Sequence, residues 1–458
     1  MPYNLRLRGH GERETEALHR TEISMVVNRV DGRSTVGDGR PGNAIVPFNV
    51  LETRNRDLFG AFAYLFRGDS LALLRTALRN WIHDENVFFA PSGECAIAQV
   101  LSLLPQKEVV MPAWICHQVK TAVRVAGKRI VFVDLARNSI NATSAEYEEA
   151  AKPGRILLIA HLFGVPTDVE RICELAKQRD CLTIEDAVPA IGGRQNGRLL
   201  GTFADFGVFS FEQSKRIPAF RGGFIVANNT DHFDVAKLER HRVTPTKQTM
   251  PYLPLAKALL QNFATNPLVY RQLTRRVFPL RPRLRELLKR GRSPEGQQAP
   301  GILNQQERPA DDAPLKAPLT PFYTKEIHPY QAQLALRMIE RMEKIGERIS
   351  DLAEEYETCF KETGIATFLP AGASKSGLMR FPIAFPGRKR AEILKHMSEK
   401  GMHLKVLWSE EEDCEGLPNC LWAARNLILL PLYTALSPGS ARRIAAALVE
   451  IEQELQGN

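Results

Sequence analysis

Six short apolar segments in the first half of the chain constrain its fold more than any other feature of the sequence. They are rich in β-branched and aromatic residues, and they lie at 107–112, 129–135, 155–164, 181–187, 206–211 and 222–229. Segments that are apolar throughout are typical of strands buried on both faces of a parallel sheet. Helical patterns stand between the earlier ones, at 93–104 and 168–179. This alternation predicts an α/β fold with a large, mostly parallel central sheet flanked by helices.

The chain divides into four segments of different character. Residues 1–44 have little apolar periodicity and are predicted to form a mobile N-terminal arm. The large α/β domain is predicted to span 45–244, and the proline-rich stretch 245–327 is predicted to be an insert with a flexible tract. Residues 328–458 are predicted to begin with one long amphipathic helix, to 360, and to continue as a smaller C-terminal α/β domain.

The positive charge of the chain is concentrated in one place. The net charge is +9, yet between positions 271 and 292 a single acid stands among nine Lys or Arg residues, at 271, 275, 276, 281, 283, 285, 289, 290 and 292. A local basic run gives no reason to expect a nucleic-acid partner. Because the preceding residues are apolar, peripheral membrane contact through 252–292 is the minority interpretation, and a solvated surface segment is the default.

Cysteine usage and the N-terminal sequence indicate the cellular compartment. The seven cysteines are scattered, odd in number and without the paired spacing of a zinc site, which favours reduced thiols and no metal. No apolar run follows the first charged residues, and no apolar stretch approaches the roughly 20 residues that a membrane span needs. We therefore expect a cytoplasmic protein, with attachment to the inner membrane face as the minority interpretation.

One lysine stands beside the predicted strands. In "FGVFSFEQSKRIPAFRGGFIV" (206–226), Ser210 ends a strand pattern, Lys215 follows in the connection, and a pair of glycines precedes the next strand. Most lysines in such places are ordinary surface residues. The alternative is that the amine of Lys215 carries a covalently bound cofactor.

Two further motifs decide between these interpretations. In "APSGECAIAQVL" (90–101), a Ser-Gly turn leads into a helix, whose N-terminal N–H groups suit a phosphate, although serine there is most often only a cap. Asp186 ends an apolar strand pattern, where open α/β sheets place ligand contacts, although alone it reads as a turn carboxylate. A phosphate site, an anion and an amine are together what pyridoxal 5'-phosphate requires.

In order and spacing, these stretches resemble the DegT/DnrJ/EryC1/StrS family of aminotransferases, which are fold-type-I enzymes dependent on pyridoxal phosphate. The resemblance extends from about 85 to 455 and includes "SGECAI", "VVMPAWIC", "LIAHLFGVPTDVERI", "IEDAVPAIGG" and "RGGFIV". It implies that Lys215 bonds the cofactor and that Asp186 pairs with its pyridinium nitrogen. Its phosphate would be held by the hydroxyl of Ser210 and by the backbone N–H groups around Gly93, Glu94 and Cys95.

The chain departs from the usual family pattern near the expected cofactor. Glu94 stands where the family usually has threonine, and Pro189 stands where glutamine or histidine is common. Cys116 occupies a position that is often aromatic and stacks on the cofactor ring, so Trp114 or His117 is expected to cover the ring instead. These departures bear on the sugar substrate more than on the cofactor.

The resemblance implies an aminotransferase that moves an amino group, plausibly from glutamate, to a keto-sugar. Family members are best known for aminating nucleotide-linked keto-sugars, so polysaccharide or glycoconjugate biosynthesis is expected. Lys215 would move the proton between substrate and cofactor. A homodimer is expected, because sites of this fold are generally built at a dimer interface. For His161 and Arg380, packing and ion-pair roles are weighed above catalytic ones.

Two alternatives remain open at this point. The first keeps the cofactor but changes the reaction to that of a lyase, a desulfurase or an amino-acid-type transferase. The position of Cys116 near the expected site favours a sulfur reaction. The second is a non-catalytic family member that acts as a regulator or scaffold. Glu94 and Pro189 favour that alternative, whereas Lys215 and Asp186 speak against it.

Overall fold

The structure is a computed structural model of the 458-residue chain. The predicted arm at 1–44, the basic run at 271–292 and the polar tract at 293–314 lie outside the residues it describes. Apart from a few single positions, the described residues are 50–64, 69–230, 252–266, 327–385, 390–400 and 412–456.

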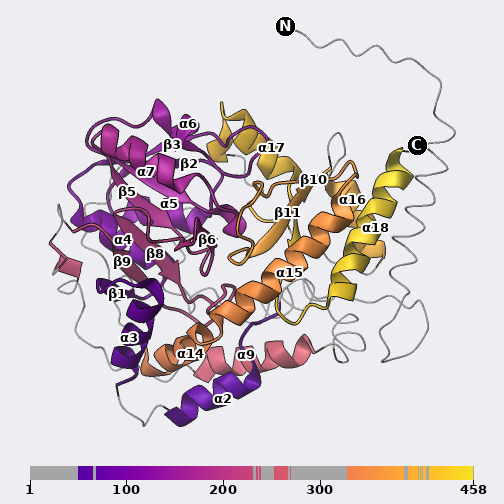
Figure 1. Ribbon diagram of the computed structural model, residues 1–458, viewed down its shortest axis with the longest axis horizontal. Coiled ribbons are helices and arrows are strands. Elements are labelled where there is room, and N and C mark those ends of the chain that lie inside the picture. The colour runs from indigo at the N-terminus through magenta and orange to yellow at the C-terminus, as the bar shows by residue number, and fades with distance from the viewer. Residues whose placement is uncertain are drawn as a thin grey trace, which may run out of the picture.

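A seven-stranded sheet occupies the centre of the molecule, in the order β1-β9-β8-β5-β4-β2-β3 (Figure 1). All neighbours pair in parallel except β9, which is antiparallel to both β1 and β8. The mostly parallel sheet predicted from the sequence is therefore confirmed, and each of the six predicted segments contains a strand. The strands are β1 Val87–Ala90, β2 Glu108–Pro112, β3 Arg129–Val133, β4 Arg155–Ala160, β5 Leu182–Asp186, β8 Phe206–Ser210 and β9 Gly223–Ala227.

Alternating side chains of these strands build a core on each face of the sheet. Ile156 and Leu158 of β4 belong to one hydrophobic cluster, whereas Leu157 and Ile159 belong to the other. This is the two-residue period of a strand that is buried on both sides. Helices α4 (Gly93–Leu103) and α5 (His117–Val125) contribute to the first cluster. On the second face lie α6 (Ser144–Glu148) and α7 (Val169–Gln178).

A smaller three-stranded antiparallel sheet follows in the C-terminal part, in the order β10-β11-β12. Helix α18 packs on α15 and on α16, so helices cover this sheet as well (Figure 1). The elements are β10 Ala366–Thr367, β11 Arg380–Ala384, β12 Ile428–Pro431, α15 Met342–Phe360, α16 Arg390–Glu399, α17 Pro418–Asn426 and α18 Pro438–Gln456. The short strands β6 Arg194–Gln195 and β7 Arg198–Leu199 form a hairpin elsewhere, after β5.

The single long helix predicted from 328 to 360 is wrong, because the chain forms two helices there. Helix α14 (Pro329–Ile339) ends before Arg341, which has non-helical backbone angles (φ −112°, ψ 1°) and precedes α15. The guanidinium of Arg341 donates to the carboxylate of Asp57 at 3.1 Å and to the backbone oxygen of Glu52 at 3.2 Å. A tertiary ion pair therefore fixes the position at which the helical pattern is interrupted.

Three more helices complete the described fold at the lower edge of Figure 1. Helices α2 (Asn55–Tyr64) and α3 (Ser70–Ile82) both pack on α14, and α9 (Tyr252–Ala264) lies beside α2. None of the described helices is long and apolar enough to cross a membrane.

A buried ion pair joins the segment before α2, the loop after β8 and the C-terminal part of the chain around β11 and β12, which is called the small domain below. The guanidinium of Arg216 lies 2.9 Å from the carboxylate of Glu52, and both side chains are less than 7% exposed. The same guanidinium donates to the backbone oxygens of Leu378 and Leu432, and Glu52 also accepts from the backbone and hydroxyl of Thr434. Because Arg216 follows Lys215 directly, this pair anchors the loop that carries the candidate lysine.

We expect the substitution Glu52→Gln to lower the free energy of unfolding by about 3–5 kcal/mol, because it leaves the Arg216 charge buried without its counter-ion. The control is Glu355→Gln, which breaks the pair between Arg442 and Glu355, whose side chains are 38% and 30% exposed. Exposed pairs contribute at most about 1 kcal/mol. Urea denaturation of the two variants measures both values, and equal losses would contradict the proposed importance of the buried pair.

Candidate active site

The predicted site residues meet at the edge where the parallel strands end. Asp186 is the last residue of β5, and the register aligns it with Ala160 at the end of β4 and with Val208 of β8. Ser210 is the last residue of β8. In open α/β sheets this carboxyl edge is where ligands bind.

A glycine in β9 brings the start of α4 close to Ser210. Gly223 pairs with Ala90 at the end of β1 on one side and with Ser210 at the end of β8 on the other. A Cβ atom on Gly223 would lie 2.4 Å from the backbone oxygen of Phe209 and 3.0 Å from the carbonyl carbon of Ser92. A side chain at this position would clash with the backbone of Phe209 and Ser92, so only glycine fits there. This is the steric reason for the tight backbone passage predicted at the glycine pair.

The first turn of α4 and the Ser210 side chain form one cradle. A Cβ on Gly93 would lie 3.0 Å from the Cβ of Ser210 and 2.9 Å from a methyl group of Val188. The Ser210 hydroxyl accepts the N–H of Glu212 at 3.2 Å, which leaves its proton to be donated to an anion. A helix N-terminus beside a hydroxyl donor is the arrangement that a phosphate requires.

The other two predicted phosphate contacts have further interactions. The backbone N–H of Cys95 donates to the Ser92 hydroxyl at 3.1 Å, an N-cap that occupies one of the expected donors. Burial raises the pKa of the Cys95 and Cys116 thiols, and the charge of Glu94, which is half-buried in the same turn, raises both further. A carboxylate therefore lies near the cradle, where the family usually has threonine.

Asp186 and Lys215 interact electrostatically. Asp186 is 4% exposed, and its carboxylate accepts the N–H of Val188 at 3.1 Å. Burial raises the pKa of the Asp186 carboxyl, and the ammonium of Lys215 opposes that rise. The amine of Lys215 is 4.0 Å from the sulfur of Met379, the residue just before β11, so the small domain contacts the lysine.

Cys116, in the loop between β2 and α5, has Lys215 and Asp186 among the charges around it. Burial raises the pKa of the Cys116 thiol, Lys215 lowers it, and Asp186 raises it further. The indole of Trp114 instead donates to the backbone oxygen of Trp408 at 2.8 Å and packs edge-on against that ring. The expectation that Trp114 covers a cofactor ring stays a prediction, and its indole nitrogen is already committed to the small domain.

A second buried carboxylate, Glu185, was not singled out from the sequence. It is fully buried and accepts backbone N–H groups of Gly201 and Phe203 as well as the Nε2–H of His161, 2.9 Å away. The Nδ1 of His161 accepts the N–H of Thr167 at 3.2 Å, so this ring is a neutral Nε2–H tautomer. Both nitrogens of His161 are thus used within the protein, as the packing interpretation predicts.

Arg380, at the start of β11, belongs to the buried charge cluster around Arg216. Burial lowers the pKa of the Arg380 guanidinium to about 10, the charge of Arg216 lowers it as well, and Glu52 and Tyr433 oppose the shift. Its Nη1 donates to the backbone oxygen of Met379 at 2.6 Å. These contacts support the structural role that the sequence favoured for Arg380.

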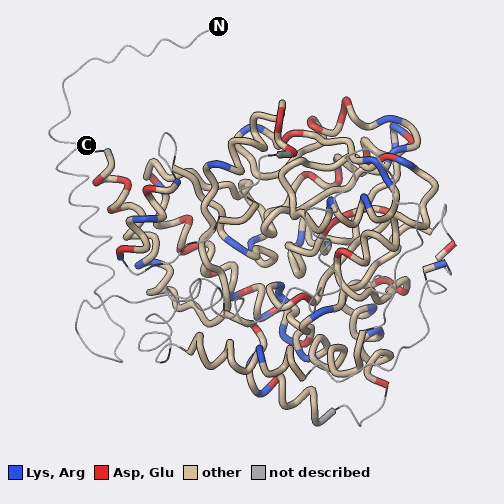
Figure 2. The backbone as a smooth tube through the Cα atoms, turned by 180° about the vertical axis from the view of Figure 1, so that it is seen from behind, with Lys and Arg blue, Asp and Glu red and all other residues tan. Residues whose placement is uncertain are grey.

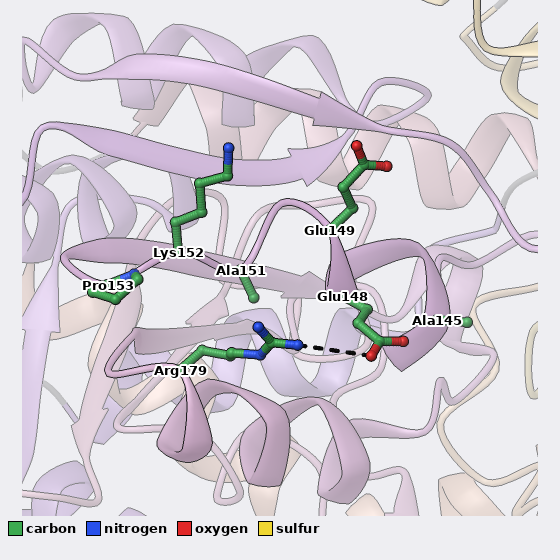
Figure 3. Close-up of a pocket in the computed structure, with 7 residues that line it drawn as sticks. All are labelled: Ala145, Glu148, Glu149, Ala151, Lys152, Pro153 and Arg179. Carbon is green, nitrogen blue, oxygen red and sulfur yellow. Dashed lines mark ion pairs between the residues drawn. The ribbon is translucent and has the colours of Figure 1, made fainter.

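A hollow of about 430 Å³ lies elsewhere on the molecule (Figure 3). Its lining includes Lys152 and Pro153, just before β4, and Arg179, just before β5, so it opens at the amino edge of the sheet. The side chains of Arg179 and Glu148 form a half-exposed ion pair across it at 3.8 Å. None of the predicted site residues lines this hollow, and no catalytic role is assigned to it.

The residues at the carboxyl edge fit pyridoxal phosphate. The cradle brings the N-terminus of α4 and the Ser210 hydroxyl together where a Cβ on Gly93 would fill the space, and burial raises the pKa of the Asp186 carboxyl, whose ionised form a cationic ring nitrogen would stabilise. Sequence reasoning missed Glu52, Arg216 and Met379. No local signal identifies them. Glu52 and Met379 reach the loop of Lys215 from distant parts of the chain, and Arg216, the residue after Lys215, forms its ion pair with Glu52 across 164 residues.

Comparison with known proteins supports the same conclusion. The profile of the DegT/DnrJ/EryC1/StrS aminotransferase family matches residues 63–254 and 321–449. The chain is 32% identical over 128 residues to the GDP-perosamine synthase of Escherichia coli O157:H7, covering 28% of this chain and 35% of that one. It is 34% identical over 135 residues to a UDP-N-acetyl-3-dehydro-alpha-D-glucosamine 3-aminotransferase of Acidithiobacillus ferrooxidans, covering 29% and 37%. The matched part is thus about a third of the length of these curated relatives.

Solved structures show the same fold. An aminotransferase TlmJ from Streptoalloteichus hindustanus superposes with a TM-score of 0.65 at 18% identity, over 90% of this chain and 100% of that one. The putative sugar aminotransferase Spr1654 from Streptococcus pneumoniae, in its PLP form, gives 0.65 at 17% identity, over 90% and 99%. The predicted family and fold class are therefore confirmed, and the family match bears out the predicted cofactor.

We expect Asp186→Asn to raise the stability of the cofactor-free protein by on the order of 1 kcal/mol near neutral pH, and to weaken pyridoxal phosphate binding. A carboxyl whose pKa is raised by folding favours the folded state in acid and loses that contribution as the pH rises through the raised pKa. The gain from asparagine should therefore be small in acid and grow toward neutral pH.

Thermal unfolding between acid and neutral pH measures this gain. The control is Asp205→Asn, because the Asp205 carboxylate accepts from the backbone and hydroxyl of Thr183 at 2.7 and 2.8 Å and should lose stability on substitution. If Asp186→Asn were less stable than the parent at every pH, the carboxylate would be a structural group.

Proposed function

Because the chain belongs to the DegT/DnrJ/EryC1/StrS aminotransferase family, we propose that it is a pyridoxal-phosphate-dependent aminotransferase acting on a keto-sugar. We further propose that the sugar is nucleotide-linked, that glutamate is the amino donor and that the active form is a cytoplasmic homodimer. The observation that supports the proposal is the electrostatic interaction of Lys215 with buried Asp186, at the edge of the sheet that also holds the cradle of Gly93 and Ser210.

Each residue of the candidate site has a separate role in cofactor binding or proton transfer. Pyridoxal phosphate, when bound, supplies an electron sink for the bond-breaking step at the substrate carbon. Lys215 would bond the cofactor, and its free amine would move a proton between substrate and cofactor. Asp186 would hold a proton on the ring nitrogen, whose positive charge would in turn stabilise the ionised form of this buried carboxyl. Ser210 and the first turn of α4 would bind the phosphate.

The curated relatives support a sugar as acceptor, since the names of the two described above specify GDP- and UDP-linked sugar chemistry. A desulfurase reaction has less support, because the raised pKa of Cys116 favours the neutral thiol, a weak nucleophile. Peripheral membrane contact through 252–292 remains a prediction, of which residues 252–266 are described.

A regulator without catalysis is the second candidate. One relative, 30% identical over 134 residues and covering 29% of this chain and 36% of that one, is named a pleiotropic regulatory protein of Geobacillus stearothermophilus. The carboxylate of Glu94 near the cradle also favours this candidate. The two candidates differ in whether an amino donor changes the cofactor.

We expect borohydride reduction of the full-length protein with pyridoxal phosphate to fix the cofactor on Lys215, as read by mass spectrometry of peptides. Lys215→Ala should lose this adduct, lose the visible absorption band and lower the transamination rate by about 10²–10⁴-fold or more. Lys395→Ala, at a lysine whose side chain is 76% exposed, should change none of these.

The same protein then distinguishes the candidates. Glutamate should bleach the visible band and a nucleotide-linked keto-sugar should restore it if the protein is an aminotransferase. An adduct on Lys215 with no response to any amino donor would favour the regulator. Absence of an adduct would overturn the cofactor assignment itself.

A further inference from the structure

The largest exposed apolar side chains of the described residues gather on two neighbouring helices. Helices α2 and α9 lie side by side at one edge of the molecule, and Asn262 of α9 donates to the backbone oxygen of Thr53 and to the side chain of Asn55 (Figure 1). Of eight exposed large hydrophobic residues in the described part of the chain, six belong to this α2–α9 surface: Phe59, Phe62, Tyr252, Leu253, Leu260 and Phe263.

Helix α9 has the pattern of a helix that lies on an apolar medium. Its residue Ala258 is buried, whereas its residues Leu253 and Leu260 are 81% and 66% exposed. Its 13 residues include one charged side chain, Lys257, and no acid, and Figure 2 draws this helix mostly tan. At about 1.5 Å per residue the helix is about 20 Å long, too short to cross a bilayer of about 30 Å. It is long enough to lie in the interface.

The charges around this surface favour an anionic partner. The exposed charged residues of α2 and α9 are Arg56, whose side chain is 66% exposed, and Lys257, and both are positive. Along the sequence, the segment 271–292 that follows α9 has nine basic residues and one acid, and it lies outside the described residues. Pairing this surface with a second copy of itself would bring like charges together, whereas anionic lipid headgroups would attract them.

We propose that the α2–α9 surface binds an anionic lipid bilayer, with α9 lying flat in the membrane interface and its exposed face inserted among the lipids. Two features of the surface act together: apolar side chains provide burial, and flanking positive charges select anionic headgroups. The inference is independent of the proposed enzymatic activity, because it involves no residue of the candidate active site.

Co-sedimentation of the full-length protein with lipid vesicles tests the proposal. We expect binding to phosphatidylcholine vesicles that contain phosphatidylglycerol, much less binding to pure phosphatidylcholine, and release at high salt. The double substitution Leu253→Gln and Phe263→Gln should weaken vesicle binding at least about tenfold, because it removes two inserted apolar side chains.

The matched control is Trp422→Gln, at an exposed aromatic residue of α17 that lies outside the surface. It should bind vesicles as the parent does. Circular dichroism shows whether the variants are folded, and hydrogen exchange of the unmodified protein tests the site without any substitution. Peptides covering 252–264 should exchange more slowly when anionic vesicles are present.

Three results would overturn the proposal. One is that the unmodified protein fails to bind anionic vesicles, and another is that it binds neutral and anionic vesicles equally. The third is that the double substitution leaves vesicle binding unchanged. If, without lipid, that substitution converts a dimer into monomers by light scattering and vesicles are not bound, the surface is an interface between copies of this chain.

Discussion

The ion pair between Glu52 and Arg216 is the interaction on which the arrangement of the candidate site depends. Arg216 is the residue after the candidate lysine, and Glu52 lies in the segment before α2. Both bind backbone groups of the small domain, Arg216 the oxygen of Leu432 and Glu52 the N–H of Thr434. Because both side chains are buried, neither can exchange its partner for water, and the pair holds three parts of the chain in one geometry. The hydroxyl of Thr53 adds a bond to the backbone oxygen of Pro218, at 3.0 Å, on the same loop. The position of Lys215 is therefore set from outside the sheet.

The sheet sets the position of the other groups. The carboxyl ends of parallel strands lie at one edge of a sheet. Asp186 and Ser210, the last residues of β5 and β8, therefore lie at the same edge without any specific attraction between them. The antiparallel strand β9 then separates β1 from β8 by only one strand width, and its first residue, Gly223, allows α4 to begin beside Ser210. A helix N-terminus and a serine separated by more than a hundred residues thus lie side by side, where we propose that they bind the phosphate.

Much of this arrangement was predictable, because its signals are local. Buried strands read as continuous apolar runs, and Asp186 and Ser210 are polar residues at the ends of such runs. The end of α14 was not predictable, since the apolar period continues through it and the interruption depends on the contact between Arg341 and Asp57. Met379 was missed for the same reason: its contact with the lysine is formed across 164 residues of sequence. Sequence patterns indicate which residues are buried. The end of α14 and the contact of Met379 with Lys215 depend instead on side chains that are distant in sequence and close in the fold.

Two carboxylates that are adjacent in sequence show how the structure separates a structural role from a functional one. Successive strand residues point to opposite faces, so Glu185 and Asp186 meet different surroundings although both are buried. Glu185 accepts from His161 and from the backbone of residues 201–204, which satisfies its charge within the protein. Asp186 receives the N–H of Val188 and the influence of Lys215, and burial still raises its pKa. A further cation would stabilise the ionised form of this buried carboxyl, and the protonated nitrogen of the proposed cofactor would supply one.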